Sequence, residues 1–63
     1  MQAIITVIIP AYNEQDSIAN VVNDIPEIVN EIIVINNNST DNTAMNAKNA
    51  GATVLYESRK GYG

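Results

Sequence analysis

Hydrophobic residues along the chain fall into three short, mostly continuous runs, which are Ile4–Ile9, Ile32–Ile35 and Ala52–Tyr56. The first run is β-branched throughout and is closed by Pro10. Continuous runs of this kind are typical of strands that are buried on both faces, as in parallel sheets. We therefore predict three strands, the first of which ends at Pro10.

The polar stretch after the first run has the spacing of an amphipathic helix. Its hydrophobic residues recur at i, i+3, i+4 and i+7, at Ile18, Val21, Val22 and Ile25. This spacing puts them in one stripe that can pack on a sheet. Asn13 is the predicted N-cap, and Pro26 is predicted to end the helix.

A second helix is predicted over Asp41–Ala50, with Ser39 or Asp41 as its cap and Gly51 as its C-terminal stop. We expect its inner face to consist of the small side chains Ala44, Ala47 and Ala50, with Met45 alongside.

The elements alternate strand, helix, strand, helix, strand, which predicts an α/β fold with a βαβαβ parallel three-stranded sheet. Right-handed crossovers place both helices on one face if the strand order is 3-2-1. The other face is then bare. We interpret residues 1–63 as the N-terminal half of a domain, and we expect it to form a homo-oligomer or to pack against further polypeptide.

Composition removes several classes of function. The chain carries 3 Lys and Arg against 7 Asp and Glu, a net charge of −4, and it has no His or Cys. Nucleic acid is therefore not an expected partner, and a disulfide framework or a zinc site of the usual ligands is excluded. No apolar run approaches the roughly 20 residues that span a bilayer, and the N-terminus lacks secretory features. We expect a cytoplasmic location and no membrane segment.

Polar residues follow all three predicted strands, at the edge where open parallel sheets bind ligands. Tyr12 offers a flat ring for stacking on a base, or it caps the sheet edge. Glu14 can accept from a ligand hydroxyl, or it complements the helix dipole. The amides of Asn36–Asn38 can match the edge of a base, or they serve the turn. Arg59–Gly63 joins two cations to two glycines, as a loop near phosphate requires, or it is a frayed tail.

These segments together resemble the N-terminus of a family 2 glycosyltransferase with the GT-A fold. The resemblance rests on Val7–Glu14, Glu31–Thr43, Gly51-Ala52 and Arg59–Gly63, and it covers essentially the whole chain. The closing Lys-Gly-Tyr-Gly is most similar to the dolichyl-phosphate mannosyltransferase-like branch, which uses a nucleotide-activated sugar.

The resemblance implies a Rossmann-like nucleotide-binding half-domain with the donor, a nucleotide-diphospho-sugar, as its partner. The residues that it places at the nucleotide are Pro10, Ala11, Tyr12, Glu14, Asn36, Asn38, Lys60 and Gly61. Pro10–Tyr12 and Glu14 would lie beside the base and ribose, Asn36 beside the edge of the uracil or guanine, and Lys60-Gly61 near the phosphates or ribose. Asp41 is given a structural role as a helix cap.

Two departures from the family limit what the chain can do. The family usually has aspartate at Asn36, and an amide there can still accept a hydrogen bond but carries no charge. The Asp-x-Asp metal motif and the carboxylate base of the family lie beyond Gly63. We therefore expect donor recognition without catalytic residues, with a divalent cation (Mg or Mn) used by the complete enzyme and no metal bound by this segment. The alternative is a non-catalytic nucleotide-binding or structural module that self-associates.

Overall fold

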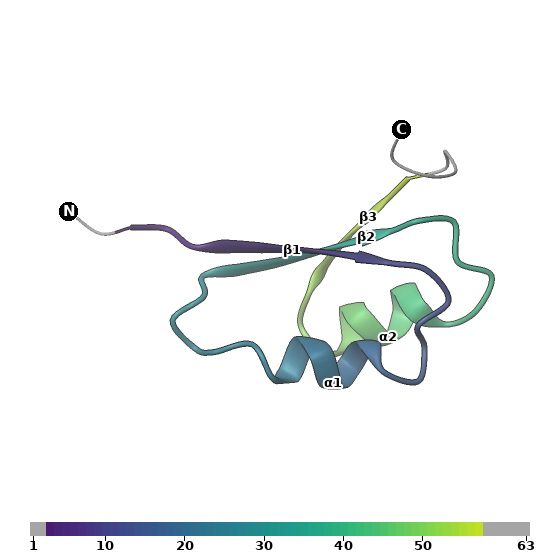
Figure 1. Ribbon diagram of the computed structural model, residues 1–63, viewed down its shortest axis with the longest axis horizontal. Helices are drawn as coiled ribbons and strands as arrows, with labels where there is room; N and C mark the ends of the chain where they lie inside the picture. The colour runs from purple at the N-terminus through teal and green to yellow at the C-terminus, as the bar shows by residue number, and fades with distance from the viewer. Residues whose placement is uncertain (1–2, 58–63) are drawn as a thin grey trace.

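The computed structural model describes residues 3–57 and shows the predicted alternation of strands and helices (Figure 1). The strands are β1 (Thr6–Ala11), β2 (Glu31–Asn36) and β3 (Thr53–Tyr56). The helices are α1 (Ile18–Asn23) and α2 (Thr43–Asn49).

The three strands form one parallel sheet in the order β1-β2-β3, with β2 at its centre. Thr6 pairs with Glu31, and Ile33 pairs with Thr53. Both helices lie on the same side of the sheet (Figure 1), as right-handed crossovers require. The α/β fold class, the parallel βαβαβ topology and the placement of both helices on one face are thus confirmed.

Side chains of β1 alternate between a covered and an uncovered face, so the prediction of a strand buried on both faces is wrong for the described residues. Val7, Ile9 and Ala11 are buried or half-buried, whereas Ile8 is 62% exposed. The reason is topological. With both helices on one face, every second residue of a strand points away from them.

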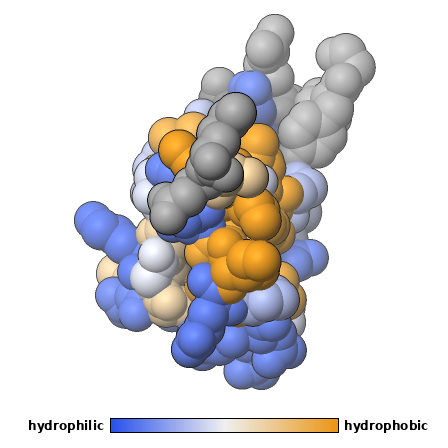
Figure 2. Space-filling model, turned by 90° about the vertical axis from the view of Figure 1, so that its left-hand side faces the viewer, coloured by the Kyte–Doolittle hydropathy of each residue, from blue (hydrophilic) through white to orange (hydrophobic). Residues whose placement is uncertain are grey.

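The uncovered side of the sheet, which we call the open face, is rich in apolar residues. By strand register it consists of Thr6, Ile8 and Pro10 from β1, Ile33 and Ile35 from β2, and Thr53 and Leu55 from β3. Leu55 is 50% exposed. Hydrophobic surface is also visible across the middle of the molecule in Figure 2. Within the described part of the chain, neither helix lies on the open face.

Pro10 lies inside β1 and does not end it, contrary to prediction, because the strand continues to Ala11. The carbonyl oxygens of Ile5 and Ala11 accept hydrogen bonds from the β2 side, from Glu31 and Asn37 respectively. Since alternate residues of a strand direct their backbone groups to opposite sides, the nitrogen of Pro10 points away from β2. Proline is tolerated there because β1 is an edge strand of the described sheet.

Helix α1 is shorter than predicted at both ends. It begins at Ile18 after Ser17, and Asn13 is not its N-cap. Asn13 instead has a φ of 50° and belongs to the preceding loop. The helix ends at Asn23, before Pro26, because the residue that precedes a proline is disfavoured in helical conformation.

Helix α2 spans Thr43–Asn49, one or two residues less than predicted at each end, and its predicted stop at Gly51 is confirmed. The N–H of Gly51 donates to Lys48 O at 3.0 Å, and the N–H of Ala52 donates to Ala47 O at 3.1 Å. This pair of bonds is the Schellman motif. It needs a positive φ at Gly51, which is 109°.

The core is small and lies between the helices and the covered face of the sheet. It consists of Ala11, Ile18, Val22, Val34, Ala47 and Ala52. The predicted helix faces are confirmed only in part, because Val21 is 40% and Met45 is 61% exposed. The short helix α1 contacts the sheet through Ile18 and Val22, which are one turn apart, so Val21 lies at the edge of the buried stripe.

Neither helix within residues 3–57 is long and apolar enough to cross a bilayer.

Replacing Ile18 by Ala tests this account of the core. Ile18 is fully buried, so we expect the free energy of unfolding in urea to fall by about 2–5 kcal/mol. Ile28 is 70% exposed, and Ile28→Ala is the matched control, with a change below about 0.5 kcal/mol. Equal losses in the two variants would contradict the proposed core.

Candidate functional site

The predicted site lies where the parallel strands end and the chain turns toward the helices. The carboxyl ends of β1, β2 and β3 meet at one edge of the sheet, since Ala11 pairs with Asn36 and Asn36 with Tyr56. Tyr12–Ser17 follow β1, and Asn37–Asn42 follow β2. These two loops therefore lie side by side.

Three consecutive backbone N–H groups of the first loop donate to side chains of the second loop and of α2. Asn13 N–H donates to Ser39 Oγ at 2.9 Å. Glu14 N–H donates to Thr43 Oγ1 at 2.7 Å, and Gln15 N–H donates to Asp41 Oδ2 at 3.3 Å. We call this set of residues, Asn13–Gln15 with Ser39–Thr43, the loop clamp.

Hydrogen bonds also run in the opposite direction across the loop clamp. The N–H of Thr40 donates to Asn13 Oδ1 at 2.9 Å, and the N–H of Asn42 donates to Gln15 Oε1 at 3.2 Å. Asn46 Nδ2 donates to the carbonyl oxygen of Gln15 at 2.9 Å. Five backbone N–H groups therefore find side-chain acceptors across the loop clamp, so the two loops form one unit.

Asp41 binds the start of α2, but the prediction of Ser39 or Asp41 as its N-cap is wrong, because that position is Asn42. Its Oδ1 accepts from the N–H of Thr43 at 3.0 Å and also from the Thr43 hydroxyl. The carboxylate thus binds the first residue of the helix, although Asn42 occupies the N-cap position. The hydroxyl bond from Thr43, followed by the N–H bonds of Thr43 and Gln15, lowers the pKa of Asp41 below its ordinary value of 3.8.

The predicted site residues at the end of β1, which are Pro10, Ala11, Tyr12 and Glu14, differ in their exposure. Tyr12 is 58% exposed, and Glu14 is exposed although its N–H is held in the loop clamp. Ala11 is 2% exposed and belongs to the core. Pro10 lies on the open face. Tyr12 and Glu14 are therefore the exposed members of this group that lie in the loop after β1, whereas Pro10 is exposed on the open face.

Asn36 lies at the end of the central strand with its side chain on the covered face, and it is 4% exposed. Its Oδ1 accepts from the N–H of Ser39 at 3.3 Å, so the amide serves the turn. Asn38 is exposed and has a φ of 57°, a left-handed conformation that asparagine tolerates. The turn role weighed for Asn38 is thus confirmed, and contact of Asn36 or Asn38 with a base stays a prediction. Lys60 and Gly61 lie outside the described residues.

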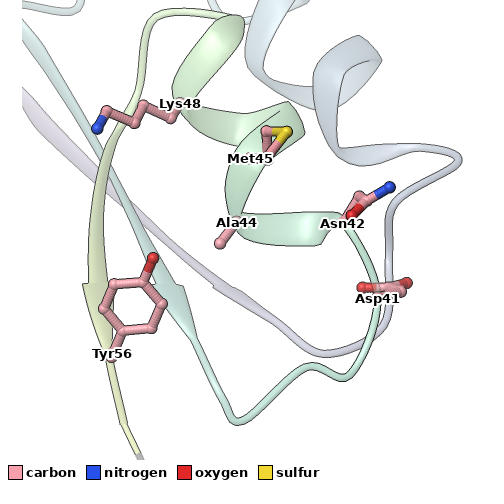
Figure 3. A pocket seen from close by; sticks show the side chains of 6 residues that line it. All are labelled: Asp41, Asn42, Ala44, Met45, Lys48 and Tyr56. Carbon is pink, nitrogen blue, oxygen red and sulfur yellow. The ribbon is translucent and has the colours of Figure 1, made fainter.

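A shallow hollow of about 370 Å³ lies between α2 and β3 and was not predicted from the sequence. It is lined by Asp41, Asn42, Ala44, Met45, Lys48 and Tyr56 (Figure 3). Tyr56 from β3 and Ala44 from α2 face it from opposite sides (Figure 3). The position of Tyr56 could have been predicted from the sequence, because Tyr56 falls two residues after Val54 and so lies on the same face of the strand.

The loop clamp was also missed as a unit. Ser39, Thr43 and Gln15 were not named as site residues, although short hydroxyl and acidic side chains after a strand commonly bind neighbouring backbone N–H groups. Within residues 3–57, no group of three His, Cys, Asp or Glu side chains could hold a metal ion. The described residues therefore do not fit a metal site.

Comparison with known sequences gives one family over nearly the whole chain. The family described as Glycosyl transferase family 2 matches residues 6–63. Protein RfbJ of Shigella flexneri is 52% identical over 61 residues, which are 94% of this chain and 47% of that protein. An uncharacterized glycosyltransferase of Mycobacterium tuberculosis is 44% identical over 59 residues, which are 94% of this chain and 27% of that protein. The chain thus spans about half the length of the first relative and about a quarter of the second.

Solved structures share the fold. Glucosyl-3-phosphoglycerate synthase from Mycobacterium tuberculosis, in complex with Mg²⁺ and uridine diphosphate (UDP), matches with a TM-score of 0.77 and 37% identity, over 84% of this chain and 20% of that chain. The same enzyme with Mn²⁺, UDP-glucose and phosphoglyceric acid matches with a TM-score of 0.78. The predicted N-terminal, Rossmann-like part of a GT-A fold is confirmed.

The lowered pKa of Asp41 makes a prediction about acid stability. A depressed pKa in the folded state contributes stability that is present above the unfolded value of 3.8 and is lost as the pH falls through the folded value. Asp41→Asn removes this contribution. We therefore expect the variant to unfold more easily in urea at pH 7, and the difference from wild type to shrink below pH 3.8. A constant difference between pH 7 and pH 2 would contradict this role.

Proposed function

Since the chain belongs to glycosyl transferase family 2, we propose that its carboxyl edge recognises the nucleotide of a nucleotide-diphospho-sugar donor. In this proposal Tyr12 stacks on the base, and Glu14 accepts a hydrogen bond from the ribose. The observation that carries the proposal is the combination of exposed side chains at Tyr12 and Glu14 with a backbone held by the loop clamp. Side chains on a fixed backbone bind at a lower entropic cost than side chains on a free loop.

We propose uridine as the nucleoside. The support comes from glucosyl-3-phosphoglycerate synthase, whose solved structures contain UDP and UDP-glucose. Those structures also contain Mg²⁺ or Mn²⁺, which supports a divalent cation in the complete enzyme. No group of three His, Cys, Asp or Glu side chains among the described residues could hold that cation.

The reaction proposed for the whole protein is transfer of a sugar from the nucleotide donor to an acceptor such as a polyprenyl phosphate or a glycan. The acceptor and the dolichyl-phosphate mannosyltransferase-like branch rest on the motif Lys60–Gly63 in the sequence. The chain would supply donor recognition, with Pro10, Ala11, Asn36 and Asn38 supporting the pocket and Lys60 with Gly61 near the phosphates.

Titration calorimetry with UDP tests donor recognition. We expect the chain to bind UDP and Tyr12→Ala to weaken binding about tenfold, because base–aromatic stacking contributes about 1–3 kcal/mol. Tyr12→Phe retains the ring and should keep most of the affinity. Ile28→Ala, in the loop before β2, is a control that should bind as wild type does. A folded chain that does not bind UDP would refute the proposal.

The open face supports a second candidate function, which is self-association. Ile8 and Leu55 are 62% and 50% exposed on a sheet surface whose only hydroxyl residues among those described are Thr6 and Thr53. Exposed apolar patches of this kind are common at protein interfaces. A second copy of the chain could cover the open face with its own.

Sedimentation velocity at increasing concentration tests self-association. We expect the wild-type chain to form a dimer, and Ile8→Lys and Leu55→Lys each to shift it toward monomer, because a buried charge without a partner is costly. Ile28→Lys is the control for an exposed isoleucine off the open face and should leave the dimer intact. A wild-type chain that stays monomeric throughout would exclude this function.

A further inference from the structure

Thr43 is a polar residue at the centre of the loop clamp with none of its surface exposed. Its Oγ1 accepts the N–H of Glu14 at 2.7 Å and donates to Oδ1 of Asp41. One hydroxyl group therefore uses its donor and its acceptor capacity at once. It links the loop after β1 to the first turn of α2.

This link determines the backbone position of the residues proposed to bind the nucleotide. Before Tyr12, the chain is anchored by Ala11, which is 2% exposed and whose carbonyl oxygen accepts from Asn37 N–H at 2.8 Å. After Tyr12, Asn13 and Glu14 are held by Ser39 and Thr43. Tyr12 thus lies between two fixed points, while its own side chain stays 58% exposed.

We propose that Thr43 is a positioning residue for nucleotide recognition, which acts by holding the Tyr12–Glu14 backbone in its binding conformation without touching the ligand. The inference rests on the proposed function, because it assigns to Thr43 a role in that same site. It explains why a hydroxyl occupies a fully buried position that an apolar residue of the same size could fill. Burial of a hydroxyl is tolerated where both of its hydrogen bonds are made.

Valine is the sharpest replacement, because it matches threonine in shape and can neither accept from Glu14 nor donate to Asp41. Serine keeps the hydroxyl and loses only the methyl group. If Thr43 positions the loop, Thr43→Val should weaken UDP binding about tenfold, and Thr43→Ser should restore most of the affinity. The probe is UDP, titrated into the protein at a temperature where circular dichroism shows each variant to be folded.

A stability control separates positioning from a general loss of structure. Val22 is a core residue at 4% exposure, away from the loop clamp, and Val22→Ala lowers stability without removing any of its hydrogen bonds. We expect this folded variant to bind UDP as wild type does. Thr53→Val, which removes a hydroxyl from the open face, should also bind normally. If Val22→Ala weakens binding as much as Thr43→Val does, the effect is structural and the inference is refuted.

The remaining outcomes are also decisive. Wild-type binding with undiminished binding by Thr43→Val overturns the role of Thr43 and leaves the proposed function standing. Absence of wild-type binding refutes the proposed function, and the inference with it. If Thr43→Val does not fold, Ser39→Ala replaces it, since it removes the acceptor of the Asn13 N–H. Weakened UDP binding by folded Ser39→Ala then supports positioning through the loop clamp, and unchanged binding overturns it.

Discussion

Hydrogen bonding between the loops that follow β1 and β2 is the interaction on which the carboxyl edge of this protein depends. The two loops are more than twenty residues apart in sequence, yet backbone N–H groups at Asn13, Glu14 and Gln15 find their acceptors in the second loop and in α2. The bond from Glu14 is partly buried, whereas those from Asn13 and Gln15 are exposed. Because side chains supply these acceptors, the edge is ordered without further regular structure.

A second constraint is the placement of both helices on one face of the sheet. It follows from the handedness of the βαβ crossovers and from the strand order β1-β2-β3. The core is consequently formed by one face of each strand, with Val34 of the central strand fully buried. The same constraint leaves Ile8 and Leu55 exposed, so the apolar surface of the open face arises from topology within the described residues.

Much of the fold could be predicted from local pattern. The β-branched runs identified the strands, and Gly51 identified the end of α2, since a positive φ there is a backbone requirement that only a few residue types meet. Element ends were less predictable. Pro10 is a strand breaker in general, and it is accommodated because its nitrogen points away from β2, which depends on pairing and not on the residue itself. Asparagine is a common N-cap residue, but the side chain of Asn13 accepts a hydrogen bond from the N–H of Thr40 in the other loop.

The sequence by itself determined the class of fold, the family and the edge at which Tyr12 and Glu14 lie, because hydrophobic period and motif spacing are local properties of a chain. Only the tertiary structure decided how that edge is held together. Asn36 turned inward to bind the N–H of Ser39, and Thr43 became the buried link between Glu14 and Asp41. These contacts join residues distant in sequence, and their partners are set by strand register and helix placement, which no single segment encodes.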